Sequence, residues 1–231
     1  IYEQMGANLD ISILFNEPTV KNFAIEIDNS SEKESGLQEI IESAKGMEYY
    51  PLTENQLGIY YECVQNPDVI KYTMPTTVKF GSDVDANKLK QAIVDTIEAH
   101  PYLKTRIINT DDGKIMQKRC DDNEIEEIEI VEIDSISNRE IMDNDIKPIP
   151  LDNNQLFRFK IYETPTETIL FIDFHHIISD GVSQGIFFND LAKAYNSEEI
   201  EAEKINGFEY SLIEDKTSVS EVSENFFKKQ F

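Results

Sequence analysis

The sequence is poor in cysteine, histidine and basic residues. It contains two cysteines, Cys63 and Cys120, and three histidines among 231 residues. Two thiols in a chain with no secretory signal are typical of a reducing, cytoplasmic setting and not of a disulfide-stapled scaffold. The sequence also has no long apolar run, so it predicts no membrane span.

Basic residues are outnumbered by acidic ones, 21 to 45, which gives a formal net charge of −24. A field of that sign repels phosphate backbones and anionic lipid, so roles in nucleic-acid or membrane binding are disfavoured. We attribute the acidity to a solvated surface. The hydrophobic content of 40% and the chain length are sufficient for one core of ordinary size.

Residues 169–181 are the stretch around which the rest of the chain is organised. A run rich in β-branched and aromatic residues ends in His175 and His176, and Asp180 and Gly181 then open a helix. Alternation along a strand places His176 with an apolar row, while His175 shares the opposite face with Asp173. Reactive groups are commonly presented where a strand ends, so we take this turn as the candidate site.

The spacing His175-His176-x-x-x-Asp180-Gly181 resembles the HHxxxDG signature of the chloramphenicol-acetyltransferase-like acyltransferases. That family includes the condensation domains of nonribosomal peptide synthetases. The motif fixes four positions, and its expected context is a strand before and a helix after.

A second resemblance lies at residues 50–61, which are similar to the "YPLTxxQxGIY" opening of condensation domains. Thr53 and Gln56 have the spacing of a capping box, so a helix is expected to begin there. Taken alone, this pattern is a well-capped first helix. Its position ahead of the histidine motif strengthens the family assignment.

The first 27 residues are predicted to form two short helices, a pair too small for a core of its own. Residues 14–20 resemble the closing "LFxxPT" part of a peptidyl carrier domain. We therefore expect a carrier remnant over residues 1–27, a polar linker over 28–48 with a short helix around Ile40, and the N-terminal lobe of a condensation domain over 49–231. No GGxS-type motif is present, so the serine that would carry 4'-phosphopantetheine is missing from this chain. We also expect the chain to be a piece of a larger protein.

The segment from Ala99 to Arg106 resembles the family's "RHPxLRTRF" sequence, with Ala99 and Lys104 where arginines are usual. In the family an arginine of this region pairs with the motif aspartate. Lys104 or Arg106 could hold Asp180, or Asp180 could rely on backbone donors. For Arg106 the alternative is an ordinary cross-strand residue.

Strands and helices alternate along the rest of the chain, with hairpin signals such as Asp112-Gly113. We expect strands at 75–80, 104–109, 114–119, 124–133 and 157–162, and helices after Asp85, near Ile141 and after Gly181, followed by a charged helix in the tail. The helix after Gly181 carries an apolar stripe, from Ile186 to Tyr195, that is expected in the core. The fold class is α/β, a mixed α+β sandwich of one chloramphenicol-acetyltransferase-like lobe, with an all-α remnant before it.

The chemistry implied by the resemblance centres on His176, the second motif histidine. Amide formation from a thioester needs an amine that loses a proton, and a neutral imidazole can accept it or orient the amine. We expect partial desolvation to keep His176 neutral. Whether it acts as a base or as a positioner stays open. His175 and Asp180 are expected to support the turn, and Gly181 to leave room for a pantetheine arm. No metal site is expected, because too few ligands gather here.

The resemblance implies peptide-bond formation between carrier-bound thioesters, with adjacent synthetase and carrier domains as partners. We expect the half-domain to be inert alone, since the family's site lies between two lobes. Three alternatives remain open: an epimerisation domain, a free-standing acyltransferase and a degenerate docking module.

Overall fold

The computed structural model describes residues 19, 21, 38–120, 125–203 and 205–217. The chain divides into two compact units, one made of Ile1–Met47 with Val219–Phe231 and the other of Glu48–Ser218. In the first unit, residues 38–44 are helical, as expected around Ile40. The carrier-like residues 1–18 lie outside the described residues, as does most of the predicted linker.

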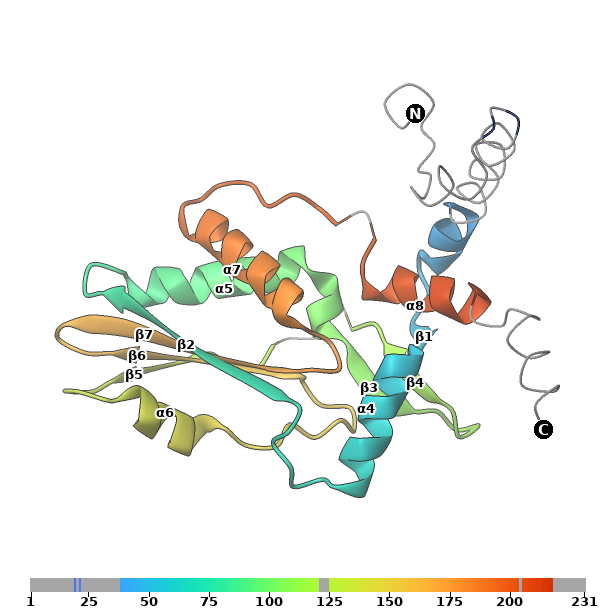
Figure 1. The fold of residues 1–231 in the computed structure, drawn as a ribbon. Helices are drawn as coiled ribbons and strands as arrows, with labels where there is room; N and C mark the ends of the chain where they lie inside the picture. The colour runs from blue at the N-terminus through green and yellow to red at the C-terminus, as the bar shows by residue number, and fades with distance from the viewer. Residues whose placement is uncertain (1–18, 20, 22–37, 121–124, 204, 218–231) are drawn as a thin grey trace. The chain divides into compact units, whose positions relative to one another are not determined.

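The second unit holds two sheets and the helices that cover them (Figure 1). Its elements in chain order are β1 (Tyr49–Pro51), α4 (Glu54–Gln65), β2 (Thr73–Gly81), α5 (Ala86–Ala99), a 3-10 turn (Pro101–Lys104), β3 (Arg106–Asn109), β4 (Ile115–Lys118), β5 (Glu129–Glu132), α6 (Asn138–Asp145), β6 (Phe157–Glu163), β7 (Glu167–His175), α7 (Gly181–Tyr195) and α8 (Gly207–Thr217).

The larger sheet has the strand order β2-β7-β6-β5, with β7 in its interior. β7 pairs antiparallel with β2 and with β6, and β5 joins the edge of β6 in parallel. The smaller sheet, β1-β4-β3, is antiparallel throughout. Its hairpin turns at Gly113, whose φ of 80° lies in the left-handed region that glycine adopts without strain.

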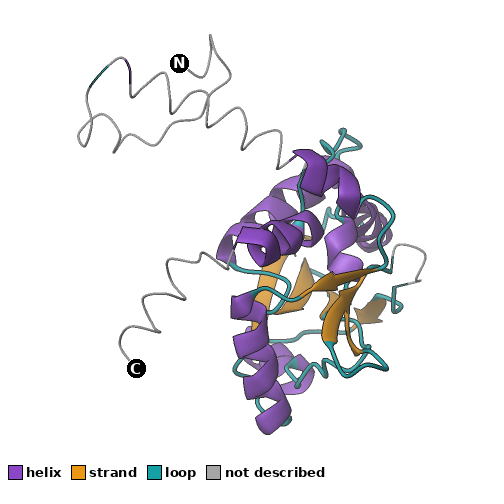
Figure 2. Ribbon diagram, turned by 90° about the vertical axis from the view of Figure 1, so that its right-hand side faces the viewer, coloured by secondary structure: helices purple, strands orange, loops and turns teal. Residues whose placement is uncertain are grey.

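The two faces of the larger sheet bury different clusters, as the alternation along β7 predicts. Leu170, Ile172 and Phe174 belong to the main core with α5 and α7, which lie together on one face. Ile169 and Phe171 face the other way and pack with Ile141 of α6. Figure 2 shows the strands with helices around them. This sandwich confirms the mixed α/β class.

Local signals account for the ends of several helices. The Thr53 side chain accepts from the Gln56 N–H, and the Gln56 side chain returns to the Thr53 N–H, which confirms the capping box of α4. Asp85 caps α5, as expected, by accepting from the N–H groups of Asn87 and Lys88.

Three expectations need correction. β5 covers four residues and not the whole alternating run 124–133, because the backbone of this run pairs with β6 only over Glu129–Glu132. Lys104 belongs to the 3-10 turn, and the strand begins at Arg106. In α7, Phe187 and Leu191 are buried as expected, but Ile186 is 50% exposed.

Candidate active site

The two histidines lie where β7 runs into a four-residue turn that leads to α7. β7 ends at His175, and Asp180 is the N-cap of α7. The turn is held by the N–H of His176, which donates to the Tyr72 carbonyl, and by the N–H of Ile178, which donates to the His175 carbonyl. The expected context of strand, turn and helix is therefore present.

His175 faces the interior and is 2% exposed. Its Nδ1 accepts from the N–H of Ile177 at 3.1 Å, so the proton of the neutral ring sits on Nε2, which lies 3.7 Å from the Cys63 Sγ. The Tyr72 ring stacks beside it at 6.4 Å. Burial, together with the neighbouring His176, lowers the pKa of His175 to about 4. His175 is thus a neutral group that ties the turn to α4.

His176 is exposed, and its Nδ1 lies 2.8 Å from the Ser179 carbonyl oxygen. A carbonyl only accepts, so Nδ1 carries a hydrogen, and in the neutral ring the lone pair is on Nε2. The expectation of partial desolvation was wrong, because the turn after β7 carries this side chain out of the apolar row that precedes it. Its tautomer is fixed by a hydrogen bond and not by burial.

Asp180 caps α7, with Oδ1 accepting from the Ser183 N–H at 2.8 Å and from the Ser183 hydroxyl at 2.7 Å. These bonds lower the pKa of Asp180, and the bond from the Ser183 N–H has the larger effect. Of the partners left open by the sequence, Lys104 pairs instead with Glu98 at 2.6 Å, and Arg106 lies opposite Lys118 in the small sheet. Among the described residues, Asp180 is therefore a helix cap and not half of a buried ion pair.

Gly181 begins α7 on the exposed side of the turn. A Cβ at this position would meet no atom within 4 Å, and its φ is not in the left-handed region. The fold of the described residues therefore does not require glycine here. The residue leaves open space next to the motif.

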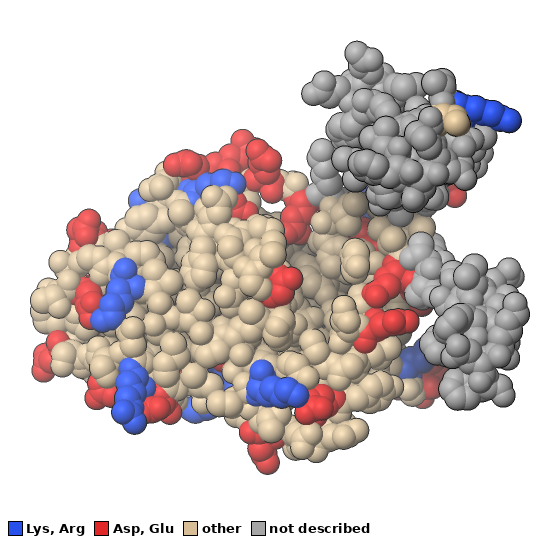
Figure 3. Space-filling view, in the orientation of Figure 1, with Lys and Arg blue, Asp and Glu red and all other residues tan. Residues whose placement is uncertain are grey.

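Two cavities flank the turn. One of about 220 Å³ is lined by Phe174, Ser179 and Phe187, and the other, of about 430 Å³, by His175 and Cys63. On the face drawn in Figure 3, charged side chains are scattered and form no continuous basic surface among the described residues.

Sequence reasoning missed two clusters near this turn. His100 contacts Asp190 and Glu203 through its two ring nitrogens, at 3.0 and 2.6 Å. Gln56 reaches the Ile177 carbonyl at 2.9 Å. His100 and Gln56 both lie in sequence motifs described above for other reasons. Their partners are 90 to 121 positions away in the sequence, so no local pattern predicts these contacts.

No group of three or more potential metal ligands occurs within the described ranges. Among the same residues, no helix has the length and apolar character needed to cross a membrane. Neither Cys63 nor Cys120 forms a disulfide.

These features define one lobe of a mixed α/β sandwich with a histidine turn at the end of its central strand. The model of the family described as "Condensation domain" matches residues 47–223, which is most of the chain. The chain belongs to this family.

Among curated proteins, the chain is 29% identical over 231 residues to surfactin synthase subunit 1 of Bacillus subtilis (strain 168), covering all of this chain and 6% of that protein. It is 30% identical over 212 residues to bacitracin synthase 2 of Bacillus licheniformis, covering 91% of this chain and 8% of that one. The chain thus spans a small part of these relatives.

Solved structures share the fold. The starter condensation domain of rhizomide synthetase RzmA superposes with a TM-score of 0.66 at 16% identity, over 75% of this chain and 45% of that one. The first condensation domain of the CDA synthetase superposes with a TM-score of 0.63 at 18% identity, over 74% of this chain and 47% of that one. The expected single lobe is confirmed.

Proposed function

We propose that this chain supplies the N-terminal lobe of a condensation domain in a nonribosomal peptide synthetase. In the intact protein, the domain would join an upstream aminoacyl or peptidyl thioester to a downstream aminoacyl amine. The observation that carries the proposal is the geometry of His176: an exposed ring whose Nδ1 donates to the Ser179 carbonyl and whose Nε2 therefore bears the lone pair.

The reaction needs that lone pair. As the amine attacks the thioester carbonyl, a carbon–nitrogen bond forms, the carbon–sulfur bond breaks and the nitrogen loses a proton. The Nε2 of His176 either takes the proton or accepts a hydrogen bond that holds the amine in line. Both roles require the Nδ1–H tautomer that Ser179 selects.

The other motif residues support this turn in distinct ways. We assign His175 to holding the turn from inside and Asp180 to capping the helix that follows it. Both substrates would arrive on 4'-phosphopantetheine arms of upstream and downstream carrier domains. The open space at Gly181 supports the proposal that such an arm passes next to His176.

The domain boundaries are part of the proposal. A carrier remnant over residues 1–27 and a linker over 28–48 agree with a family match that begins at residue 47 and a first strand that begins at Tyr49. The two thiols outside disulfides support a reducing, cytoplasmic setting.

The test uses the full-length parent synthetase and measures its peptide product. His176→Ala should abolish condensation, whereas Glu198→Ala, a change at an exposed residue after α7, should leave the rate unchanged. Product formation at the normal rate by His176→Ala would make the domain a scaffold. Deuterium exchange at the substrate α-carbon without a new peptide bond would make it an epimerisation domain.

The isolated chain is expected to be inactive, because it covers less than half of the condensation domains that it resembles. A condensation assay with two loaded carrier domains checks this. A measurable rate from the 231-residue chain alone would show that one lobe is sufficient.

A further inference from the structure

The side chain of Gln56 links the start of α4 to the histidine turn. Gln56 is 7% exposed, and its amide contacts two backbone groups. The Oε1 accepts from the Thr53 N–H at 2.9 Å, and the Nε2 donates to the Ile177 carbonyl at 2.9 Å. A backbone N–H only donates and a carbonyl only accepts, so these partners fix which end of the amide faces the turn.

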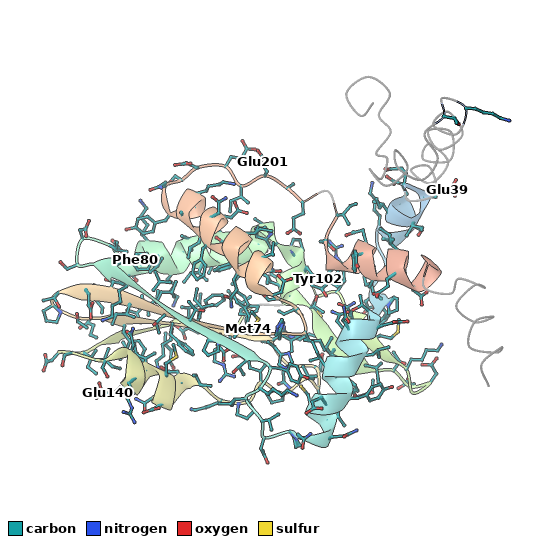
Figure 4. All side chains as sticks on the ribbon, in the orientation of Figure 1. Glu39, Met74, Phe80, Tyr102, Glu140 and Glu201 are labelled. Carbon is teal, nitrogen blue, oxygen red and sulfur yellow. The ribbon has the colours of Figure 1, made fainter. Side chains whose placement is uncertain are left out.

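A second bond anchors the donor end of Gln56. The Nε2 also lies 2.7 Å from the Tyr102 hydroxyl, which in turn donates to the Oε1 of Gln117 at 2.7 Å. The Tyr102 side chain is labelled in Figure 4. The Gln117 amide then reaches the Pro51 carbonyl at 2.8 Å. The amide of Gln56 is therefore held at both ends within a buried polar network, where such bonds are strong and the loss of one partner is costly.

Ile177 is the residue directly after His176, and its peptide groups are held on both sides. Its N–H donates to the Nδ1 of His175 at 3.1 Å, and its carbonyl accepts from Gln56. Two residues further on, the Ser179 carbonyl receives the Nδ1–H of His176. The path of the backbone through Ile177 therefore sets where that carbonyl lies relative to the imidazole.

We propose that Gln56 is a positioning residue for His176: it fixes the Ile177 peptide so that the Ser179 carbonyl selects the Nδ1–H tautomer. This inference rests on the proposed function only in naming His176 as the reacting group. The amide is suited to the task because it presents an acceptor to α4 and a donor to the turn. A glutamate would place a second acceptor against the Ile177 carbonyl, and a methionine would offer neither group.

The direct test is ¹⁵N NMR of His176 in the 231-residue chain. The neutral wild-type ring should be mainly the Nδ1–H tautomer. Gln56→Met should shift the population toward the Nε2–H tautomer, which predominates in unstructured peptides. Unchanged nitrogen shifts in a folded Gln56→Met protein would overturn the proposal.

Gln155→Met is the matched control, because Gln155 is also buried and its amide also bonds two backbone groups, the Glu126 N–H at 2.9 Å and the Phe157 carbonyl at 3.0 Å, but among the described residues it has no hydrogen bond to Gln56 or to the turn. It should be destabilised to a similar extent and keep the wild-type tautomer. An equal tautomer shift in both variants would mean that the tautomer of His176 follows the general stability of the fold, which would also overturn the proposal.

Gln56→Glu gives a second measurement should Gln56→Met fail to fold, because it keeps an acceptor for Thr53. Its carboxylate offers no hydrogen to the Ile177 carbonyl, so the neutral His176 ring should lose its preference for the Nδ1–H tautomer, and unchanged nitrogen shifts in this variant would equally overturn the proposal. In the full-length parent, Gln56→Met should lower kcat by roughly ten- to a hundredfold with little change in KM, as expected for one buried hydrogen bond. The NMR result is independent of activity, so it can stand or fail separately from the proposed function.

Discussion

His175 and His176 are neighbours in the chain and lie in opposite environments. The first is 2% exposed and lies 3.7 Å from the Cys63 Sγ, and the second is exposed and donates to the Ser179 carbonyl. The alternation of a strand turns adjacent side chains to opposite sides, and the turn after β7 completes the separation. One imidazole therefore supports the fold while the other faces solvent.

This difference predicts that alanine substitutions of the two histidines have unequal effects on stability. His175→Ala should lower the free energy of unfolding by about 2–4 kcal/mol, since it leaves a cavity and removes the acceptor of the Ile177 N–H. His176→Ala should change it by no more than about 0.5 kcal/mol, as is usual for exposed positions. Urea unfolding of the two variants checks this, and equal losses would contradict the assignment of roles.

His175 and Asp173 should contribute to the pH dependence of stability with opposite signs. The pKa of His175 is lowered from 6.5 to about 4, so the unfolded state binds its proton first, and stability falls as the pH drops from 6.5 toward 4. Burial, opposed by Arg158 and by the Met74 N–H, raises the pKa of Asp173 from 3.8 to about 6. The folded state then binds that proton first, so stability rises as the pH drops from 6 toward 3.8. Each contribution is on the order of 3 kcal/mol, and the two nearly cancel.

Asp173→Asn should reveal the contribution of His175 to the pH dependence of stability. Asp173 is fully buried, its Oδ2 lies 3.4 Å from the Arg158 Nε, and that oxygen has no hydrogen-bond donor among the described residues. Removing the charge should make stability fall more steeply between pH 6 and 4 than in the wild type, by on the order of 3 kcal/mol. Unfolding in urea across this range measures the difference, with exposed Asp143→Asn as the control. Parallel curves for wild type and Asp173→Asn would refute it.

Much of the fold was predictable because its signals are local. The capping box at Thr53 needs one side chain and the N–H three residues on, and the alternation along β7 predicts both buried faces. The length of β5 was not predictable, because β5 pairs with β6 only over Glu129–Glu132 although β6 already begins at Phe157. A single sequence does not record which residues of two neighbouring strands pair.

The site was predictable in part for the same reason. The position of His176 at the end of β7 follows from the strand pattern. Its exposure and its tautomer depend on the turn, which Gln56 reaches from 121 positions away. The partner of Asp180 was left open between a cation and backbone donors, and its short-range contact with Ser183 at the start of α7 decides it.

A second pH effect should come from His100, which joins the end of α5 to α7 and to the segment before α8. Both its nitrogens face carboxylates, Asp190 and Glu203, and the hydrogen bond to Glu203 raises its pKa despite burial. The charged ring therefore stabilises the fold fully below pH 6.5, and this contribution is lost as the pH rises through the raised pKa. Glu203→Gln should lower the pKa of His100 in an NMR titration and flatten the stability loss above pH 6.5. A titration identical to wild type would contradict the pairing.

Asp180 should act as an ordinary helix cap. Asp180→Ala should destabilise the chain by about 1 kcal/mol, and Asp180→Asn by less, because asparagine retains the acceptor that Ser183 uses. Asp85→Ala at the cap of α5 is the matched control and should show a similar loss. Thermal unfolding of the variants measures these changes. A loss of several kcal/mol at Asp180 alone would instead indicate a buried ionic partner.

Alanine substitutions at two glycines should change the stability of the chain in opposite directions. A Cβ at Gly207, the first residue of α8, would lie 2.2 Å from the Tyr102 ring. That ring is fixed by its bonds to Gln56 and Gln117, so it cannot move aside, and Gly207→Ala should destabilise the chain by about 1–3 kcal/mol. At Gly185, within α7, a Cβ would meet no atom within 4 Å, and alanine should stabilise the helix by about 0.5–1 kcal/mol. Urea unfolding compares both variants with the wild type. If Gly207→Ala were as stable as the wild type, α8 would not pack on Tyr102 as described. The network that holds the histidine turn would then not be rigid.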